Sequence, residues 1–268
     1  SEWIELLNIS AATIDLSKLS LVGIDYTFPL GFTLPPDARV VIVKNQAAFA
    51  AAYDITGITI APGEFSTSSL SNSGEQIALI DALEIDAQRF TYNDKTPWPT
   101  SPDGDGYSIV LIYPQANPDH TDPSHWRSSS APGGTPGGSD ATSFTGDPNL
   151  DNDNDGLSSL LEYALGSLNG DAGSSPESYP TVGIGTFDNG AGLSDDYPTI
   201  SYRRNLSADD VIYDVEVSPD LESWSNQDTT LVSSSANGDG TETVTYRSNA
   251  PLGNLGREFF RIKASLRP

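Results

Sequence analysis

The stretch ARVVIVK, from Ala38 to Lys44, contains four consecutive β-branched residues, which pack well on the pleated surface of a sheet. Pro35-Pro36 interrupts the chain just before it. After it comes NQAAFAAAYD, from Asn45 to Asp54, whose composition predicts a short helix with Asn45 as its N-cap. A strand between such signals favours a fold rich in β-structure.

Further strand candidates surround this stretch up to about Arg127, and turn signals separate them. The candidates are WIELL (3–7), IDLSKLSLVGI (14–24), QIALID (76–81) and YSIVLIY (107–113). The turn signals include Pro62-Gly63 and Asn72-Ser73-Gly74. Many short strands at this spacing predict an immunoglobulin-like β-sandwich.

The composition changes at SSSAPGGTPGGSDATS, from Ser128 to Ser143, which is typical of a linker. Strand patterns then return in TVGIGTF, TISYRR, VIYDVEVS, TETVTYRS and REFFRIKASL, between residues 179 and 266, and they predict a second, smaller β-sandwich. We therefore expect a mainly β chain with a first domain over 1–137, a linker with an acidic loop and helix over 138–170, and a C-terminal β domain over 171–268.

Several segments of the first region resemble, in order and spacing, the lamin-tail domain family. They are SEWIELLN, IDLSKLSL, FPLGFTLPPDARVVIV, SLSNSGEQIALID, YNDKTPWPTSPDGDGYSIVLI and DPSHW, which together extend over about the first 137 residues. The resemblance implies an immunoglobulin-like sandwich with no accepted catalytic residues. It also implies a place on secreted or surface proteins of bacteria, where such domains sometimes lie beside hydrolytic domains.

The C-terminal region is similar to a β-rich module found on secreted proteins of Verrucomicrobia and related bacteria. The segments that carry this resemblance are YPTISYRRNLSADDVIYDVEVSPDLESWS and REFFRIKASL, which follow an acidic segment there too. The resemblance implies a β fold and an extracellular location, and it says nothing about activity.

Composition excludes several classes of function. Thirty-seven acidic residues against 13 basic ones give a net charge of −24, which disfavours binding to nucleic acid or to anionic lipid. There is no cysteine, so disulfides, thiolate metal sites and thiol nucleophiles are excluded. The sequence contains no apolar run long enough to span a membrane.

The stretch DNDNDGLSSLLEYALG, from Asp151 to Gly166, matches the twelve-residue calcium loop of an EF-hand. Its sharp turn falls on Gly156, at the sixth position. Calcium is a hard cation that takes six to eight oxygen ligands, and this spacing places such oxygens around one point. The expected metal ligands are Asp151, Asp153, Asp155, the carbonyl of Leu157, Ser159 and Glu162. The cofactor we expect is therefore Ca2+, and the alternative is a solvated acidic turn.

A helix is predicted to follow this loop, because Leu157, Leu160, Leu161, Ala164, Leu165 and Leu168 recur at helical spacing. The segment SFTGDPNL before the loop is a poor helix because it contains Gly146 and Pro148. The loop therefore resembles the half-hands of dockerin-like and thrombospondin-type-3-like repeats. In extracellular proteins such sites bind calcium with dissociation constants of about 10⁻⁴ to 10⁻³ M.

No catalytic site is expected, so we interpret the chain as a non-enzyme. The two histidines, His120 and His125, lie near Asp119 and Asp122 in a proline-rich run. They read as solvated loop residues, with a transition-metal site as the alternative. Paired carboxylates for glycoside hydrolysis remain open in so acidic a chain, but no motif selects a pair.

We interpret the chain as a calcium-stabilised structural or adhesion protein, secreted to a bacterial surface. In the resembling family another segment usually precedes the WIEL strand, so Ser1–Asn8 offers an open edge at which copies of the chain could assemble into a filament. Polysaccharide or matrix is the other expected partner. The alternative function is an accessory or carbohydrate-binding region of a larger secreted hydrolase.

Overall fold

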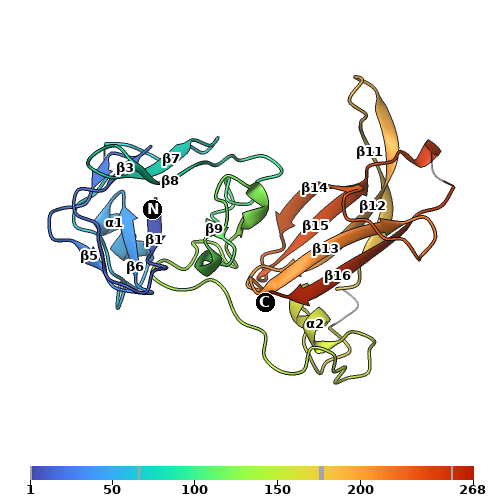
Figure 1. Cartoon of the computed structure of the whole chain (residues 1–268). Coiled ribbons are helices and arrows are strands. Elements are labelled where there is room, and N and C mark those ends of the chain that lie inside the picture. Colours follow the sequence, from blue (N-terminus) through green and yellow to red (C-terminus); the bar gives the residue numbers. More distant parts are fainter. Residues whose placement is uncertain (1, 66, 175–177, 255) are drawn as a thin grey trace. The chain divides into compact units, whose positions relative to one another are not determined.

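The computed structural model describes residues 2–65, 67–174, 178–254 and 256–268. The chain is mainly β, with short helices between antiparallel strands (Figure 1). It forms two compact units. The first contains Ser1–Trp98, Pro102–Arg127 and Gly133–Asp140, and the second contains Pro99–Ser101, Ser128–Pro132 and Ala141–Pro268.

The first unit is built from short antiparallel strands. Strand β1 (Trp3–Leu7) pairs with β6 (Arg39–Val43), β2 (Ile14–Asp15) pairs with β5 (Thr33–Leu34), and β9 (Ile109–Leu111) pairs with β10 (Trp126–Ser128). A four-stranded sheet has the order β4 (Tyr26–Thr27), β3 (Ser20–Val22), β7 (Gln76–Ile80), β8 (Asp86–Thr91). Two 3₁₀ turns, η1 (Pro114–Ala116) and η2 (Pro123–His125), lie between β9 and β10.

Strand β6 is buried on both of its faces, which explains its continuous run of apolar residues. Val40 and Ile42 pack in the larger core with Phe28 and Phe65. Val41 and Val43 face the other way and pack with Phe49 of α1 (Gln46–Ala52). The strand therefore holds the helix against the rest of the unit.

The predicted helix and its cap are confirmed. The side chain of Asn45 accepts a hydrogen bond from the Ala48 N–H at 2.7 Å, which satisfies one of the unpaired donors at the start of α1. The WIELL strand is also confirmed residue for residue. Strands β4 and β5 were not predicted, because a strand of two residues is too short to show an alternating pattern. Strand β8 was not predicted because its sequence DAQRFT is largely polar.

The glycine-rich segment that we expected to be a linker is held against the first unit from Gly133 to Asp140. The Gly137 N–H donates to the Glu5 carboxylate at 2.6 Å, and the Tyr53 hydroxyl donates to the Gly133 carbonyl at 2.8 Å. At the end of the segment, Asp140 forms an ion pair with Arg127. Hydrogen bonds thus order a stretch whose composition is typical of a flexible chain.

The second unit is a sandwich of two antiparallel sheets. The larger sheet has the order β11 (Thr181–Asp188), β12 (Ser194–Asn205), β15 (Thr241–Ser248), β14 (Thr229–Ala236). The smaller one pairs β13 (Val211–Ser218) with β16 (Phe259–Leu266). A 3₁₀ turn, η4 (Leu252–Asn254), precedes β16. The second β domain was predicted, but β14 was missed because its sequence TTLVSSSA is rich in serine.

The core of the second unit lies between these sheets and is closed by a helix. Ile200, Tyr202 and Val244 come from the larger sheet, and Val215 comes from the smaller one. The short helix α2 (Ser159–Leu165) contributes Leu165 to the same core. The acidic loop lies directly before α2, so the core of this unit fixes one end of the loop.

Candidate metal site

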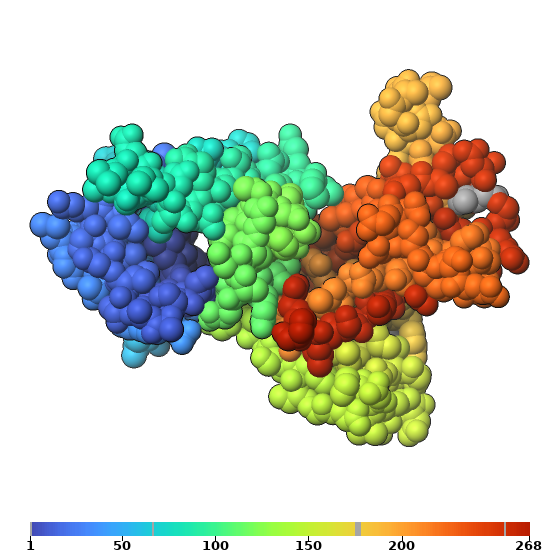
Figure 2. All heavy atoms as spheres, viewed as in Figure 1, coloured from blue at the N-terminus to red at the C-terminus, as the bar shows by residue number. Residues whose placement is uncertain are grey.

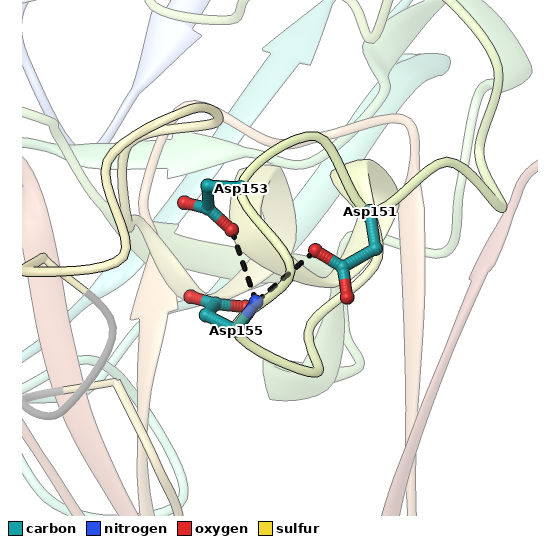
Figure 3. Close-up of side chains that lie close together, drawn as sticks. All are labelled: Asp151, Asp153 and Asp155. Atoms are coloured by element: carbon teal, nitrogen blue, oxygen red, sulfur yellow. Dashed lines mark hydrogen bonds between the residues drawn. The ribbon is translucent and has the colours of Figure 1, made fainter.

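The three aspartates of the acidic loop converge. One carboxylate oxygen from each of Asp151, Asp153 and Asp155 lies within 4.8 Å of the others (Figure 3). Among the residues that the structure describes, this is the group of acidic or histidine side chains placed closely enough to share a cation. All three side chains are partly buried, which strengthens their mutual repulsion and their attraction for a cation.

The backbone of the loop has the shape that lets the aspartates converge. Asn154 and Gly156 both adopt positive φ, at 59° and 96°. Asparagine tolerates this left-handed conformation and glycine adopts it without a Cβ penalty. The N–H groups of Asp155 and Gly156 donate to the Asp151 carboxylate at 3.3 and 3.1 Å, so Asp151 also braces the turn.

Glu162, on α2, is the most informative residue of the site. Its side chain is 0% exposed, and neither carboxylate oxygen has a hydrogen-bond partner among the residues that the structure describes. One oxygen of Asp153 is likewise buried without a partner. Buried carboxylates are normally paired, hydrogen-bonded or bound to a metal, because an unpaired buried charge is strongly unfavourable. Within the described part of the chain, the Glu162 carboxylate therefore lacks the partner that a buried carboxylate normally has.

The charges of the loop aspartates act on the Glu162 carboxyl. Burial raises the pKa of its carboxyl above the usual range, and the negative charges of the loop, that of Asp153 first, raise the pKa further. Glu162 nevertheless lies outside the group of oxygens within 4.8 Å. A cation bound by the aspartates would therefore have the Glu162 carboxylate on the side that faces α2.

The other two expected ligands are placed differently. The N–H of Leu157 donates to the Asp155 carboxylate at 2.8 Å and its side chain is buried in the core, so the position of the residue is fixed. The hydroxyl of Ser159 donates to the Leu150 carbonyl at 2.6 Å. Ser159 thus fastens the segment before the loop to the start of α2, a role that the spacing did not reveal.

Tyr179 was not singled out in the sequence, yet it supports the loop. Its hydroxyl donates to the backbone carbonyl of Asp155 at 2.9 Å. The sequence gives little indication of this contact, because Tyr179 lies 24 residues after Asp155, just before β11. This hydrogen bond connects the middle of the loop to the larger sheet.

The helix after the loop is shorter than its apolar pattern predicted. Gly166 adopts φ 78° and ends α2, while its N–H donates to the Glu162 carbonyl. Leu168 lies beyond this end and is exposed, so it is not part of the apolar face. The hydroxyl of Tyr213 donates to the Ala164 carbonyl, which anchors the last turn to β13.

Among the described residues, the two histidines and the acids near them form no group of three or more that is close enough to share a metal ion. The Nδ1 atom of His120 lies 2.9 Å from the Pro118 carbonyl, and that of His125 lies 2.8 Å from the Asp119 carbonyl. The interpretation of His120 as a solvated residue is wrong, because its ring packs edge-on against Trp126 at 5.7 Å. Burial accordingly lowers the pKa of His120 below its usual value.

The comparisons with known proteins identify part of the chain. Residues 1–94 match the Lamin Tail Domain family, which is an immunoglobulin-like domain without a catalytic role. The match agrees with the family expected from the sequence and ends before the predicted boundary at residue 137. No curated protein and no solved structure matches the chain.

The described part of the chain contains no helix long and apolar enough to cross a membrane. Within that part, Tyr179 is the aromatic residue with an exposed side chain. The carbohydrate-binding alternative remains a prediction.

Proposed function

We propose that the chain is a calcium-stabilised, non-catalytic structural or adhesion protein that is secreted to a bacterial surface. The observation that carries this proposal is the Glu162 carboxylate, which is fully buried and makes no hydrogen bond beside three converging aspartates. The arrangement supports a bound cation because a cation would satisfy all these oxygens together.

The donor set favours calcium over other metals. The site offers carboxylate oxygens and the Leu157 carbonyl, which are hard ligands, and no histidine or thiolate. Magnesium requires a compact octahedron and retains its water, whereas calcium accepts the wider, irregular shell that such a loop provides. An affinity of about 10⁻⁴ to 10⁻³ M suits a protein that works where calcium is abundant, outside the cell.

The position of the site explains what calcium would do. The loop is joined to the core through α2 and to the larger sheet through Tyr179. A bound ion would therefore stabilise the fold of the second unit and drive no chemistry. At a free calcium concentration ten times the dissociation constant, the gain in the free energy of unfolding is about 1.4 kcal/mol.

Self-assembly through β1 is part of the proposal. The Lys44 N–H donates to the Glu2 carbonyl and the Asn8 N–H to the Ala38 carbonyl, so alternate residues between them face β6. The backbone groups of Trp3, Glu5 and Leu7 consequently face the opposite side. Ser1, the first residue of the expected edge, lies outside the described residues.

Isothermal titration calorimetry and thermal unfolding of the full chain test the metal site. We expect calcium to bind with one equivalent and to raise the Tm of the second unit, and EDTA to reverse the rise. Magnesium at the same concentration is the control and should give a smaller rise. An identical Tm in calcium and in EDTA would contradict the proposed calcium site and, with it, the proposed function.

A further inference from the structure

Strand β11 is an edge strand of the second unit, and its outer side has free backbone groups. The Asn189 N–H donates to the Leu193 carbonyl at the tip of the β11–β12 hairpin, which fixes the alternation of the ladder behind it. By this alternation, Thr181, Gly183, Gly185 and Phe187 bond to β12. The N–H and C=O groups of Val182, Ile184 and Thr186 therefore face away from the sheet.

Two apolar side chains of β11 are exposed although they lie on the core side of the sheet. Val182 lies opposite Ile200 and Ile184 lies opposite Pro198, so both point to the core side of the sheet. They are nevertheless 67% and 64% exposed, whereas Ile200 and Pro198 are buried. The opposing sheet contains only β13 and β16 among the described strands, and it leaves the core side of β11 uncovered.

The β11–β12 hairpin extends from the body of its unit, as the amber lobe of Figure 2 shows. The first seven residues of β11, Thr181–Phe187, include no charged residue and no proline. Phe187 lies across Gly185, where an added Cβ would come within 2.5 Å of the ring. The edge is thus long, neutral and regular, which is the kind of edge that pairs readily with another strand.

The other edges of this unit are protected. Thr100 donates to the Ser234 carbonyl and Ser101 accepts from the Ala236 N–H along β14, which also has a β-bulge. The outer edge of β13 is bridged by Ser225. Strand β16 carries the exposed cations Arg261 and Lys263, and charges of this kind oppose strand addition. Within the described strands, β11 lacks each of these devices.

We propose that β11 pairs with β11 of a second copy of this chain, in antiparallel orientation and centred on Ile184. This register overlays the neutral stretch Thr181–Phe187 on itself and leaves Asp188 outside the pairing. Ile184 lies opposite its counterpart, Val182 lies opposite Thr186, and the outward backbone groups of both strands bond to each other. The exposed faces of Val182 and Ile184 become partly covered.

Charge selects the antiparallel orientation. The hairpin tip carries Asp188, Asp195 and Asp196, and the chain has a net charge of −24. Antiparallel pairing places the two Asp188 residues at opposite ends of the paired strands, about 26 Å apart for eight residues at about 3.3 Å each. This separation is about three Debye lengths of 8 Å at physiological salt, so repulsion between the tips is screened. Parallel pairing would bring the tips together.

The cysteine-free chain allows a direct test by disulfide trapping. Cα atoms of directly opposite residues in the hydrogen-bonded position are about 5.5 Å apart, which is within the range of a disulfide. Under mild oxidation, Ile184→Cys should form covalent dimers of the full chain. Val182→Cys and Thr186→Cys should each do so weakly alone and strongly when mixed. Leu221→Cys, at a 57% exposed position of the same unit, is the matched control and should form no covalent dimer.

Sedimentation velocity supplies the second measurement, without any cross-link. The unmodified chain should form dimers whose proportion rises with concentration, with a dissociation constant of about 1 mM or lower. Ile184→Lys should weaken dimerisation at least tenfold because it places like charges opposite each other, whereas Leu221→Lys should not. Circular dichroism should show both variants folded. A monomeric wild type, dimers that persist in Ile184→Lys, or trapping of Ile184→Cys no faster than the control would overturn the proposal.

This inference needs neither the metal nor the β1 edge, so its failure would leave the proposed calcium site standing. Trapping should proceed equally in calcium and in EDTA. Conversely, if the full chain does not bind calcium while disulfide trapping succeeds, only the proposed function is contradicted.

Discussion

Arg127 and Asp140 form an ion pair in which both side chains are only 3% exposed. They lie at the two ends of the glycine-rich segment, and their pairing holds Gly133–Asp140 within the first unit. Two buried charges are tolerated only when each compensates the other. The pair therefore helps to fix the position of Gly133–Asp140, a segment without a hydrophobic core of its own.

We expect Asp140→Ala to destabilise the first unit by about 3–5 kcal/mol, because it leaves the buried Arg127 guanidinium without its carboxylate. Urea unfolding of the full chain measures this loss. The exposed pair Asp86–Arg89 is the control, and Asp86→Ala should lower stability far less because water screens an exposed pair. Equal losses in the two variants would show that burial of the first pair has no energetic consequence.

Glu162→Gln should have opposite effects with and without calcium. In EDTA the variant should be more stable than the wild type, because it removes a buried charge that the loop aspartates repel. In calcium it should lose most of the stabilisation, because one ligand charge is gone. The measurement is the Tm in both conditions, with exposed Glu222→Gln as the control. A variant that is less stable than wild type in EDTA would mean that Glu162 has a structural partner instead of a metal.

Gly74 should be far more sensitive to substitution than Gly104, although both adopt φ +96°. A Cβ on Gly74 would lie 2.3 Å from the Tyr92 carbonyl oxygen, whereas one on Gly104 would meet nothing within 4 Å. We expect Gly104→Ala to cost about 1 kcal/mol from backbone strain alone, and Gly74→Ala to cost at least twice as much. Chemical denaturation compares the two, and similar values would be evidence that the turn relaxes freely.

Removal of the α1 cap should cost about 1 kcal/mol. Asn45→Ala deletes the acceptor of the Ala48 N–H, while Asn45→Ser retains an oxygen at the same place. The alanine variant should be less stable in urea unfolding, and the serine variant should recover most of the difference. If serine gives no recovery, packing of Asn45 and not the hydrogen bond stabilises the helix start.

The stability of the first unit should depend on the protonation of Glu5. Burial raises the pKa of this carboxyl, although Gly137 and Arg39 oppose the rise. Between its unfolded and folded pKa values the folded chain keeps a proton that the unfolded chain has released, so stability falls as pH rises through this interval. In Glu5→Gln this part of the pH dependence should vanish. Parallel stability–pH curves for the variant and the wild type would rule out this contribution.

The elements that could be read from the sequence are those whose signal is local. ARVVIVK and VIYDVEVS are strands because dense β-branched residues have few other favourable conformations. The loop aspartates converge because one backbone turn spaces them, so their arrangement follows from the positions of Asp151, Asp153 and Asp155 alone.

The features that the sequence did not reveal depend on distant partners. Ser159 bonds to Leu150, Tyr179 to Asp155, and Arg127 to Asp140, and no composition or period marks these pairs. The openness of β11 is also non-local, because TVGIGTF looks like any buried strand until the opposing sheet is found not to cover it.

The hydrogen bond from Tyr179 to the Asp155 carbonyl has a mechanical consequence. It joins the metal loop to a residue that lies two positions before β11, so a force applied along this strand reaches the loop as well as the sheet. A loop closed around a divalent ion resists extension more than one held by hydrogen bonds alone. In single-molecule pulling, the second unit should therefore rupture at a higher force when calcium is present, so that the ion sets the tensile strength of the chain.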